Sequence, residues 1–245
     1  MLTPSPLDAA LYLVPTPIGN REDITLRALR VLASADILAA EDTRTLRKLL
    51  AMYSITPRQV VAYHEQNERV QSQRLADAIE QGKSVALCSE AGMPIVSDPG
   101  FRLVREVIER QLAVVPLPGA NAALTALVAS GLPVHAFAFV GFPPHRKGRR
   151  AFFDWLAAKE ETVILYESPH RLERTIADLL AACGSDRPCV LARELTKIYE
   201  SFYRGTLGSI ASELGTTIPL RGEFVVLLHG RLTTTHGECS SRSKE

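Results

Sequence analysis

The chain has 245 residues, 46% hydrophobic and 22% charged, a composition that is typical of a soluble globular protein and excludes disorder over most of its length. Its 28 basic and 27 acidic residues nearly cancel, so overall charge gives no support for nucleic-acid binding, and an anionic partner has to be held by a local patch. Four cysteines without a C-x-x-C spacing predict neither a zinc site nor a disulfide framework, and they fit a reducing cytoplasm.

Apolar runs alternate with helical patterns through the first half of the chain. Buried strands are predicted at 11–14, 37–40, 60–63, 85–88 and 114–117. Amphipathic helices are predicted between them, at 25–33, 45–52, 69–81 and 101–110. This alternation indicates an α/β fold with a mostly parallel sheet that is covered by helices on both faces.

The rhythm changes near Pro118. Strand-like runs follow at 137–142, 162–166, 189–193, 201–205 and 224–229, with only two or three helices among them. The short polar link between two of these runs favours antiparallel pairing. We therefore predict an α/β domain at 1–118 and an α+β domain with a mixed sheet at 119–231. Residues 232–245 are rich in Thr, Ser and charge and are predicted to be a disordered tail.

Residues 122–142 form the one uncharged run of nearly membrane-spanning length. Gly131, Pro133 and His135 interrupt it, so a helix followed by a strand explains it better than a bilayer span. The first residues lack the basic and apolar regions of a signal peptide. We expect a soluble protein.

The segment from Ser89 to Gly100, with the sequence SEAGMPIVSDPG, follows the fourth predicted strand. Its two glycines and two prolines restrict the backbone and let main-chain groups approach a small molecule closely. Open α/β sheets bind ligands at the carboxyl ends of their strands, so this loop predicts a ligand site. Its last four residues are also typical of a helix start, and we favour a capping role for Asp98 over contact with substrate.

The first predicted strand ends in VPTPIGN, where a dinucleotide-binding fold has G-x-G-x-x-G. Pro15 and Pro17 lack the N–H donors that a phosphate needs, so a cofactor held by its pyrophosphate is disfavoured. A nucleoside-like ligand without phosphates stays open, and S-adenosylmethionine is the commonest of these. The alternative is a rigid turn without a ligand.

Two further segments end predicted strands of the first domain. PLPGAN, at 116–121, opens a helix of small residues whose free N–H groups can hold a cofactor, although a capped helix has the same pattern. The segments EDTR and YHEQNE carry Glu41, Asp42, Arg44 and His64 toward the same edge of the sheet. Their carboxylates are suited to orienting a hydroxyl substrate or to acid and base catalysis, and helix capping is the alternative.

Polar clusters also follow strands of the second domain. PPHRKGRR, at 143–150, is the densest basic patch of the chain and predicts either phosphate contacts with RNA or a charged surface loop. The clusters at 166–171 and 193–197 predict ion pairs among Glu167, Arg171, Arg193 and Glu194, or a functional Lys197 that stabilises an alkoxide.

Nine ordered motifs together resemble the ribosomal RNA small subunit methyltransferase I family, a branch of the tetrapyrrole methylase superfamily. They are VPTPIGN, EDTR, YHEQNE, SEAGMPIVSDPG, PLPGAN, FVGFPPHRKGRR, YESPHRL, RELTK and RGEFVVL. The resemblance implies a two-domain homodimeric enzyme that uses S-adenosylmethionine to methylate the ribose 2′-oxygen of a decoding-centre cytidine in 16S rRNA of the small ribosomal subunit. It implies no metal, no DNA and no membrane.

The resemblance also assigns residues. The cofactor is expected in the cleft between the domains, on residues of the loops after the first, fourth and fifth strands and on one residue of the second domain: Pro15, Glu90, Ala91, Gly92, Met93, Gly119, Ala120, Asn121, Ala122 and Tyr166. The residues expected to face RNA are Arg44, His64, Arg146, Lys147, Arg149 and Arg150. Related branches carry Gly-Asp-Pro in place of Ser89-Glu90-Ala91, so a tetrapyrrole substrate is disfavoured.

The expected chemistry is methyl transfer by proximity and orientation, with help in removing the proton of the hydroxyl. The candidate bases are Glu41, Asp42, Glu90 and Lys197. Two alternatives stay open. In the first, the substrate is a tetrapyrrole or a protein side chain. In the second, the protein is a sensor that binds the cofactor without transferring its methyl group.

Overall fold

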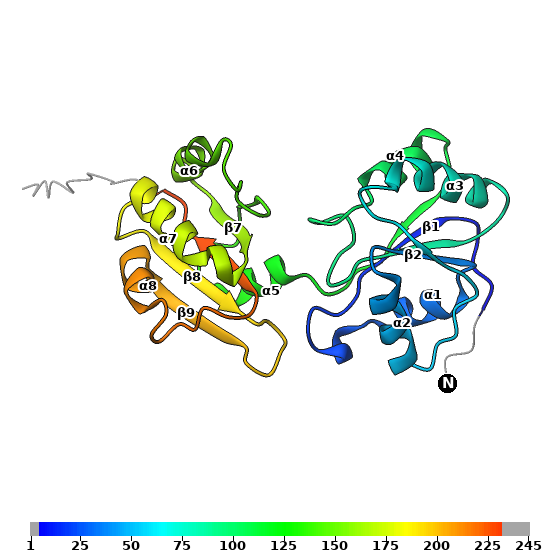
Figure 1. The fold of residues 1–245 in the computed structure, drawn as a ribbon, viewed down its shortest axis with the longest axis horizontal. Helices are drawn as coiled ribbons and strands as arrows, with labels where there is room; N and C mark the ends of the chain where they lie inside the picture. The colour runs from blue at the N-terminus through cyan, green and yellow to red at the C-terminus, as the bar shows by residue number, and fades with distance from the viewer. Residues whose placement is uncertain (1–4, 232–245) are drawn as a thin grey trace, which may run out of the picture. The chain divides into compact units, whose positions relative to one another are not determined.

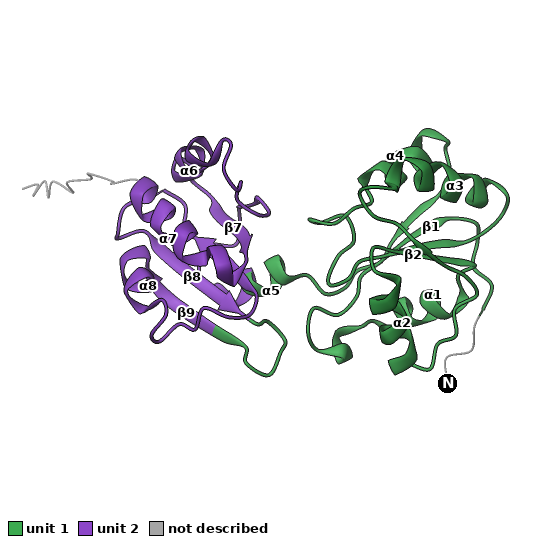
Figure 2. Cartoon of the chain, viewed as in Figure 1, with its two compact units in different colours: residues 1–126, 194–201 green, residues 127–193, 202–245 purple. Residues whose placement is uncertain are grey.

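The computed structural model describes residues 5–231, so the predicted tail at 232–245 lies outside the described residues. Within them the chain forms two compact units (Figure 2). Unit 1 contains residues 5–126 and Glu194–Ser201, and unit 2 contains residues 127–193 and 202–231. We expected the boundary at Pro118. The division falls after Ala126, inside helix α5 (Ala122–Ser130), so this helix is shared by the two units.

Unit 1 contains a parallel sheet of five short strands in the order β3-β2-β4-β1-β5. The strands are β1 (Leu11–Val14), β2 (Ile37–Ala40), β3 (Val60–Ala62), β4 (Val85–Cys88) and β5 (Val114–Pro116). Leu11 lies in register with Val85 on one side and with Val114 on the other. Strands β1, β2 and β4 carry apolar side chains on both faces, as expected for a sheet covered by helices twice.

Helices cover both faces of this sheet (Figure 1). On one face, α1 (Leu26–Ser34) and α2 (Thr43–Met52) contribute Leu32 and Leu50 to a core that includes Leu38 of β2. On the other face, α3 (Glu68–Glu80) and α4 (Phe101–Glu109) form a second core. A short 3-10 helix, Arg21–Asp23, precedes α1. The predicted α/β architecture of the first half is confirmed.

The order of the strands positions the candidate site. Strand β1 is followed by α1 on one face of the sheet, and its neighbour β4 is followed by α4 on the opposite face. The chain therefore leaves two adjacent strands in opposite directions. Open α/β sheets bind ligands in the crevice outside the carboxyl ends of the strands at such a switch point.

Unit 2 contains a mixed sheet in the order β6-β7-β10-β8-β9. Strand β6 runs parallel to β7, and β10 runs antiparallel to both β7 and β8. The bounds are β6 (Phe137–Phe139), β7 (Thr162–Glu167), β8 (Pro188–Arg193), β9 (Ser201–Thr206) and β10 (Phe224–Leu228). Helices α6 (Arg149–Ala157), α7 (Pro169–Cys183) and α8 (Leu207–Glu213) pack into one core with β7, β8 and β10. The predicted mixed sheet is confirmed.

The long uncharged run at 122–142 forms helix α5 and then strand β6. Gly131 and Pro133 lie between the two elements, where the helical pattern is interrupted. Among residues 5–231, no helix is long and apolar enough to cross a membrane.

Arg187, immediately before β8, connects three segments of unit 2. Its side chain is 6% exposed and donates hydrogen bonds to the backbone oxygens of His229 (2.7 Å), Lys159 (3.2 Å) and Ala157 (3.4 Å). These oxygens belong to the ends of β10 and α6, where backbone acceptors lack partners within their own element. One planar guanidinium therefore satisfies carbonyls from segments far apart in sequence.

We predict that Arg187→Lys lowers the free energy of unfolding by about 1–3 kcal/mol, because a single ammonium cannot reach all three oxygens and leaves part-buried acceptors unsatisfied. Urea denaturation followed by circular dichroism measures this change. An unchanged midpoint of unfolding contradicts it.

Candidate active site

The loops that follow β1 and β4 are hydrogen-bonded to each other at the switch point. The Thr16 N–H donates to the Gly92 oxygen at 3.0 Å, and the Gly92 N–H donates to the Thr16 oxygen at 2.9 Å. The buried Thr16 hydroxyl donates to the Ser89 backbone oxygen at 3.2 Å. These bonds hold the backbone of both loops in place.

Two glycines allow the loops after β1, β4 and β5 to approach closely. Gly92 has a φ of +83°, and a Cβ there would lie 3.3 Å from Cγ2 of Ile18. A Cβ on Gly119 would lie 2.6 Å from Cβ of Pro15, a distance that real Cβ atoms do not adopt. The structure therefore brings together three residues that the family resemblance assigns to the cofactor, Pro15, Gly92 and Gly119.

The other residues assigned to the cofactor have varied surroundings. Glu90 and Ala91 are exposed, and Met93 is half-buried. Asn121 accepts a hydrogen bond from the Leu124 N–H at 3.0 Å, so it caps α5, which begins at Ala122 immediately after it. Ala120 is half-buried next to Gly119.

Tyr166 belongs to unit 2, on strand β7. Its ring contacts the rings of Phe139 and Phe142 edge-on, with centroid distances of 4.8 and 5.6 Å. Three aromatic residues thus gather at this end of β6 and β7, and Phe142 is the exposed member of the group.

Lys197 lies beside the loop after β1, although its segment connects β8 to β9 in the sequence. The Asn20 N–H donates to Oγ1 of Thr196 at 2.9 Å, and a Cβ on Gly19 would lie 2.5 Å from Cγ of Lys197. Nζ of Lys197 pairs with Glu194 at 3.0 Å. Glu194 and Thr196 adopt positive φ angles of 51° and 63°, a strained conformation that concentrates at functional sites.

Asp42 has a structural role. Its Oδ1 accepts the backbone N–H of Arg44 at 2.7 Å at the start of α2, and its Oδ2 forms an ion pair with the Arg44 guanidinium at 2.9 Å. These bonds lower the pKa of Asp42 to about 2. A carboxylate that is so weakly basic is unsuited to removing a proton, and the geometry favours the capping interpretation of this residue.

Three other carboxyl groups surround one small cavity at the carboxyl edge of the sheet. Glu41 follows β2, Glu90 follows β4, and Asp98 lies further along the loop after β4. The cavity has about 10 Å³, close to what one water molecule requires, and its other lining residues are Tyr63, Leu87, Cys88, Ser89 and Pro99. Like charges gathered at a partly desolvated place disfavour ionisation of each other.

Two of these carboxyl groups, those of Asp98 and Glu90, are less acidic than usual. Burial raises the pKa of Asp98 to about 6, and the charges of Glu41 and Glu90 add to the effect. Burial also raises the pKa of Glu90, again with Glu41 contributing. Asp98 in addition lines a second cavity of about 650 Å³ beside α3 and α4, whose other side chains include Glu65, Glu68, Arg102 and Arg105.

The predicted capping role of Asp98 is wrong. Helix α4 begins at Phe101 after Gly100, and no side chain caps its first turn. Ile95, Ser97 and Gly100 all have positive φ, and these turns carry the Asp98 side chain to the cavity. Ser-Asp-Pro-Gly is a good helix start in sequence, but the backbone after β4 turns too sharply for its carboxylate to cap α4.

The residues assigned to RNA are divided between the two units. Arg44, 84% exposed, and the half-buried His64 lie in unit 1, and Nδ1 of His64 is buried with no hydrogen-bond partner among residues 5–231. Arg146, Lys147 and Arg150 are exposed in unit 2.

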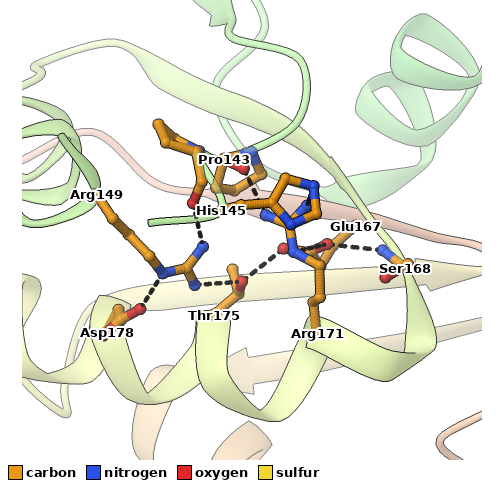
Figure 3. Close-up of polar contacts among 9 residues, drawn as sticks. Pro143, His145, Arg149, Glu167, Ser168, Arg171, Thr175 and Asp178 are labelled. Carbon is orange, nitrogen blue, oxygen red and sulfur yellow. Dashed lines mark hydrogen bonds and ion pairs between the residues drawn. The ribbon is translucent and has the colours of Figure 1, made fainter. Parts of the chain in front are cut away.

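Arg149 differs from its neighbours in this basic segment. It is only 5% exposed and donates to Asp178, Thr175 and the Pro144 oxygen (Figure 3). Its guanidinium is used inside unit 2, which the sequence pattern did not reveal.

We also searched the side chains for a group that could bind a metal ion. In the part of the chain that the structure describes, no three His, Cys, Asp or Glu side chains are arranged to hold a metal ion.

Comparison with known proteins places the chain in a family. The model for tetrapyrrole (corrin/porphyrin) methylases matches residues 10–211. A protein from Halalkalibacterium halodurans named ribosomal RNA small subunit methyltransferase I is 48% identical over 221 residues, which are 90% of this chain and 75% of that protein. A protein of the same name from Mesorhizobium japonicum is 49% identical with the same coverage. The chain belongs to the ribosomal RNA small subunit methyltransferase I family.

A solved structure shares the fold of this family member. Uroporphyrin-III C-methyltransferase from Thermus thermophilus, complexed with S-adenyl homocysteine, superposes with a TM-score of 0.61. The match covers 90% of this chain and 97% of that one, at 22% sequence identity. This likeness shows the fold and agrees with the family model.

We predict that Asp98→Asn stabilises the protein at neutral pH by on the order of 1 kcal/mol, after allowance for solvent screening. The native carboxyl has a pKa of about 6, and in the unfolded chain the value is about 3.9. The native state therefore binds the proton more tightly, and wild-type stability falls as the pH rises from about 4 through 6.

The asparagine cannot ionise, so its advantage should be present at pH 7.5 and absent at pH 4. Thermal unfolding at the two pH values measures it. An equal difference in stability between variant and wild type at both pH values contradicts the raised pKa of Asp98.

Proposed function

We propose that this protein uses S-adenosylmethionine to methylate the ribose 2′-oxygen of a decoding-centre cytidine in 16S rRNA of the small ribosomal subunit. The observation that carries the proposal is the 48% identity, over 90% of the chain, to a relative named as a small subunit rRNA methyltransferase. The proposal includes a homodimer in the cytoplasm, where the subunit is assembled.

The residues at the switch point fit this cofactor. Its sulfonium and ammonium groups are cations, and Glu41, Glu90 and Asp98 make the carboxyl edge of the sheet acidic. The close packing at Gly92 and Gly119 presents backbone groups rather than side chains, and Pro15 and Pro17 supply no phosphate-binding turn. When bound, the cofactor supplies an electrophilic methyl group.

The chain must provide a base for the ribose hydroxyl, which is a weak nucleophile in its neutral form. Asp98 is the best candidate because a pKa of about 6 leaves it ionised at pH 7 and makes it a stronger base than an ordinary aspartate. Burial and the charges of Glu41 and Glu90 raise its basicity, and Asp98 also lines the cavity beside α3 and α4. Such a base contributes about 10²- to 10⁴-fold to the rate.

Exposed cations support RNA over a protein side chain as the substrate. Arg146, Lys147 and Arg150 follow one another within five residues at the surface of unit 2. Contacts with successive phosphates require such a cluster, and each contact makes binding sensitive to salt. A protein side chain does not require it.

The decisive experiment supplies labelled S-adenosylmethionine and small ribosomal subunits from cells that lack this protein. The proposal expects label in 16S rRNA, at one cytidine ribose of the decoding centre when the modified position is mapped. Label in ribosomal protein, in an added tetrapyrrole, or at a base rather than a ribose overturns the proposed reaction. Tight cofactor binding without transfer identifies a sensor instead.

We further predict that kcat/KM of methyl transfer rises with pH to a plateau, with a midpoint near the Asp98 pKa of about 6. In Asp98→Asn the rise disappears and the rate at pH 7.5 falls by about 10²-fold or more. Asp42→Asn is the matched control, because the pKa of Asp42 is about 2 and asparagine also caps helices. An Asp98→Asn variant that retains the pH-dependent rise shows that another group is the base.

A further inference from the structure

Two arginines hold the loop between β6 and α6 by its backbone (Figure 3). Arg149 donates through Nη1 to the Pro144 oxygen at 2.8 Å. Arg171, on α7, donates through Nη2 to the Pro143 oxygen, and its Nη1 lies 3.1 Å from Nε2 of His145. The backbone oxygens of two consecutive residues, Pro143 and Pro144, are thus bound by arginines at the start of the loop at 143–148. The two proline rings restrict the backbone further.

The two arginines are joined behind the loop by a buried polar network. Nη2 of Arg149 donates to the Thr175 hydroxyl at 2.9 Å, and this hydroxyl donates to Oε2 of Glu167 at 2.6 Å. The Glu167 side chain is 0% exposed, and its Oε1 lies 3.5 Å from Nε of Arg171. Thr175 is therefore a relay, because it accepts from one arginine and donates to the carboxylate that pairs with the other.

Sequence spacing on α7 makes this arrangement possible. Arg171, Thr175 and Asp178 are four and then three residues apart, which places them along one face of the helix. Asp178 binds Nε of Arg149 at 2.6 Å. Buried charges are tolerated only when paired and hydrogen-bonded, and here each one has partners with well-defined geometry.

The opposite side of the same loop is open to solvent. Arg146 and Lys147 are exposed, and within residues 5–231 neither of them forms an ion pair. The loop therefore combines a fixed backbone with cations that have no acidic partner there. A surface of this kind binds an anion with less loss of conformational entropy than a mobile loop.

We propose that Arg149, Arg171 and Thr175 are positioning residues for RNA binding, which hold the loop at 143–148 so that Arg146 and Lys147 meet successive phosphates. This inference rests on the proposed function, since it takes rRNA as the partner. The three residues act through the loop and do not touch RNA themselves.

The test uses Thr175→Val, which keeps the shape of the side chain and removes the relay hydroxyl, and Thr175→Ser, which keeps the hydroxyl. Arg149→Lys and Arg171→Lys keep the charge but cannot bind several acceptors at once. Arg187→Lys is the control, because Arg187 is as buried as Arg149 and also binds backbone carbonyls, none of them in this loop. Affinity is measured for unmethylated small ribosomal subunits at one salt concentration, and S-adenosylmethionine affinity is measured in parallel.

We expect about tenfold weaker binding of subunits for Thr175→Val, Arg149→Lys and Arg171→Lys, with cofactor affinity unchanged. Thr175→Ser and Arg187→Lys should bind like the wild type, the latter despite its lower stability. The inference is overturned if Arg187→Lys weakens subunit binding to the same extent. It is also overturned if Thr175→Val, Arg149→Lys and Arg171→Lys leave subunit binding unchanged.

A double-mutant cycle separates positioning from stability. When Arg146 and Lys147 are both replaced by Gln, the loop has lost the cations that it presents, so adding Thr175→Val should weaken binding no further. A full additional loss overturns the inference, because it shows that Thr175 acts elsewhere. If the wild-type protein binds the subunits but methylates no rRNA, the proposed reaction fails while the positioning role can still be measured; if it does not bind them, both fail.

Discussion

The hydrogen-bonded pair Thr16 and Gly92 is the constraint on which the candidate site depends. It joins the loops of two adjacent parallel strands, β1 and β4, whose following helices lie on opposite faces of the sheet. Loops that leave in opposite directions would otherwise separate and expose unpaired backbone groups. The pair closes this gap with main-chain atoms, and Gly119 adds the third loop by packing directly on Pro15. The candidate site is consequently a surface of ordered backbone, with carboxylates at its border.

In unit 2, side chains rather than backbone groups hold the basic loop at 143–148 in place. Its basic loop contains residues that repel each other, and a loop of this composition has little apolar surface to bury. Arg149 and Arg171 turn inward to bind its carbonyls, and Glu167 and Asp178 compensate their charges. The basic segment thereby contributes one buried cation, Arg149, that helps Arg171 of α7 to organise the loop, and exposed cations that face solvent. Arg187 likewise binds backbone oxygens at the ends of β10 and α6, away from the basic loop.

Strands, helices and their order followed from local patterns, since apolar runs at 11–14, 37–40 and 85–88 are short, uncharged and separated by amphipathic segments. Within the site, Pro15, Gly92 and Gly119 were named from the motif resemblance, and the structure brings them together. Asp98 was misjudged because Ser-Asp-Pro-Gly satisfies the local rules for a helix start, and only the positive φ angles before Gly100 direct its carboxylate elsewhere. Arg149 was indistinguishable from Arg146 and Arg150 in the sequence, since burial of one arginine depends on Asp178 and Thr175, about 30 residues away.

The sequence by itself determined the fold class, the family and the chemical character of each loop, because periodicity, proline and glycine positions and ordered motifs are local properties of the chain. The tertiary structure decided which charged groups are available. It paired Asp42 with Arg44, gathered Glu41, Glu90 and Asp98 around one cavity, and placed Lys197 beside the loop after β1. The acidity and the accessibility of a charged group depend on its burial and on neighbours that are distant in sequence. The pKa values and interaction partners of such groups are therefore set only when the protein folds.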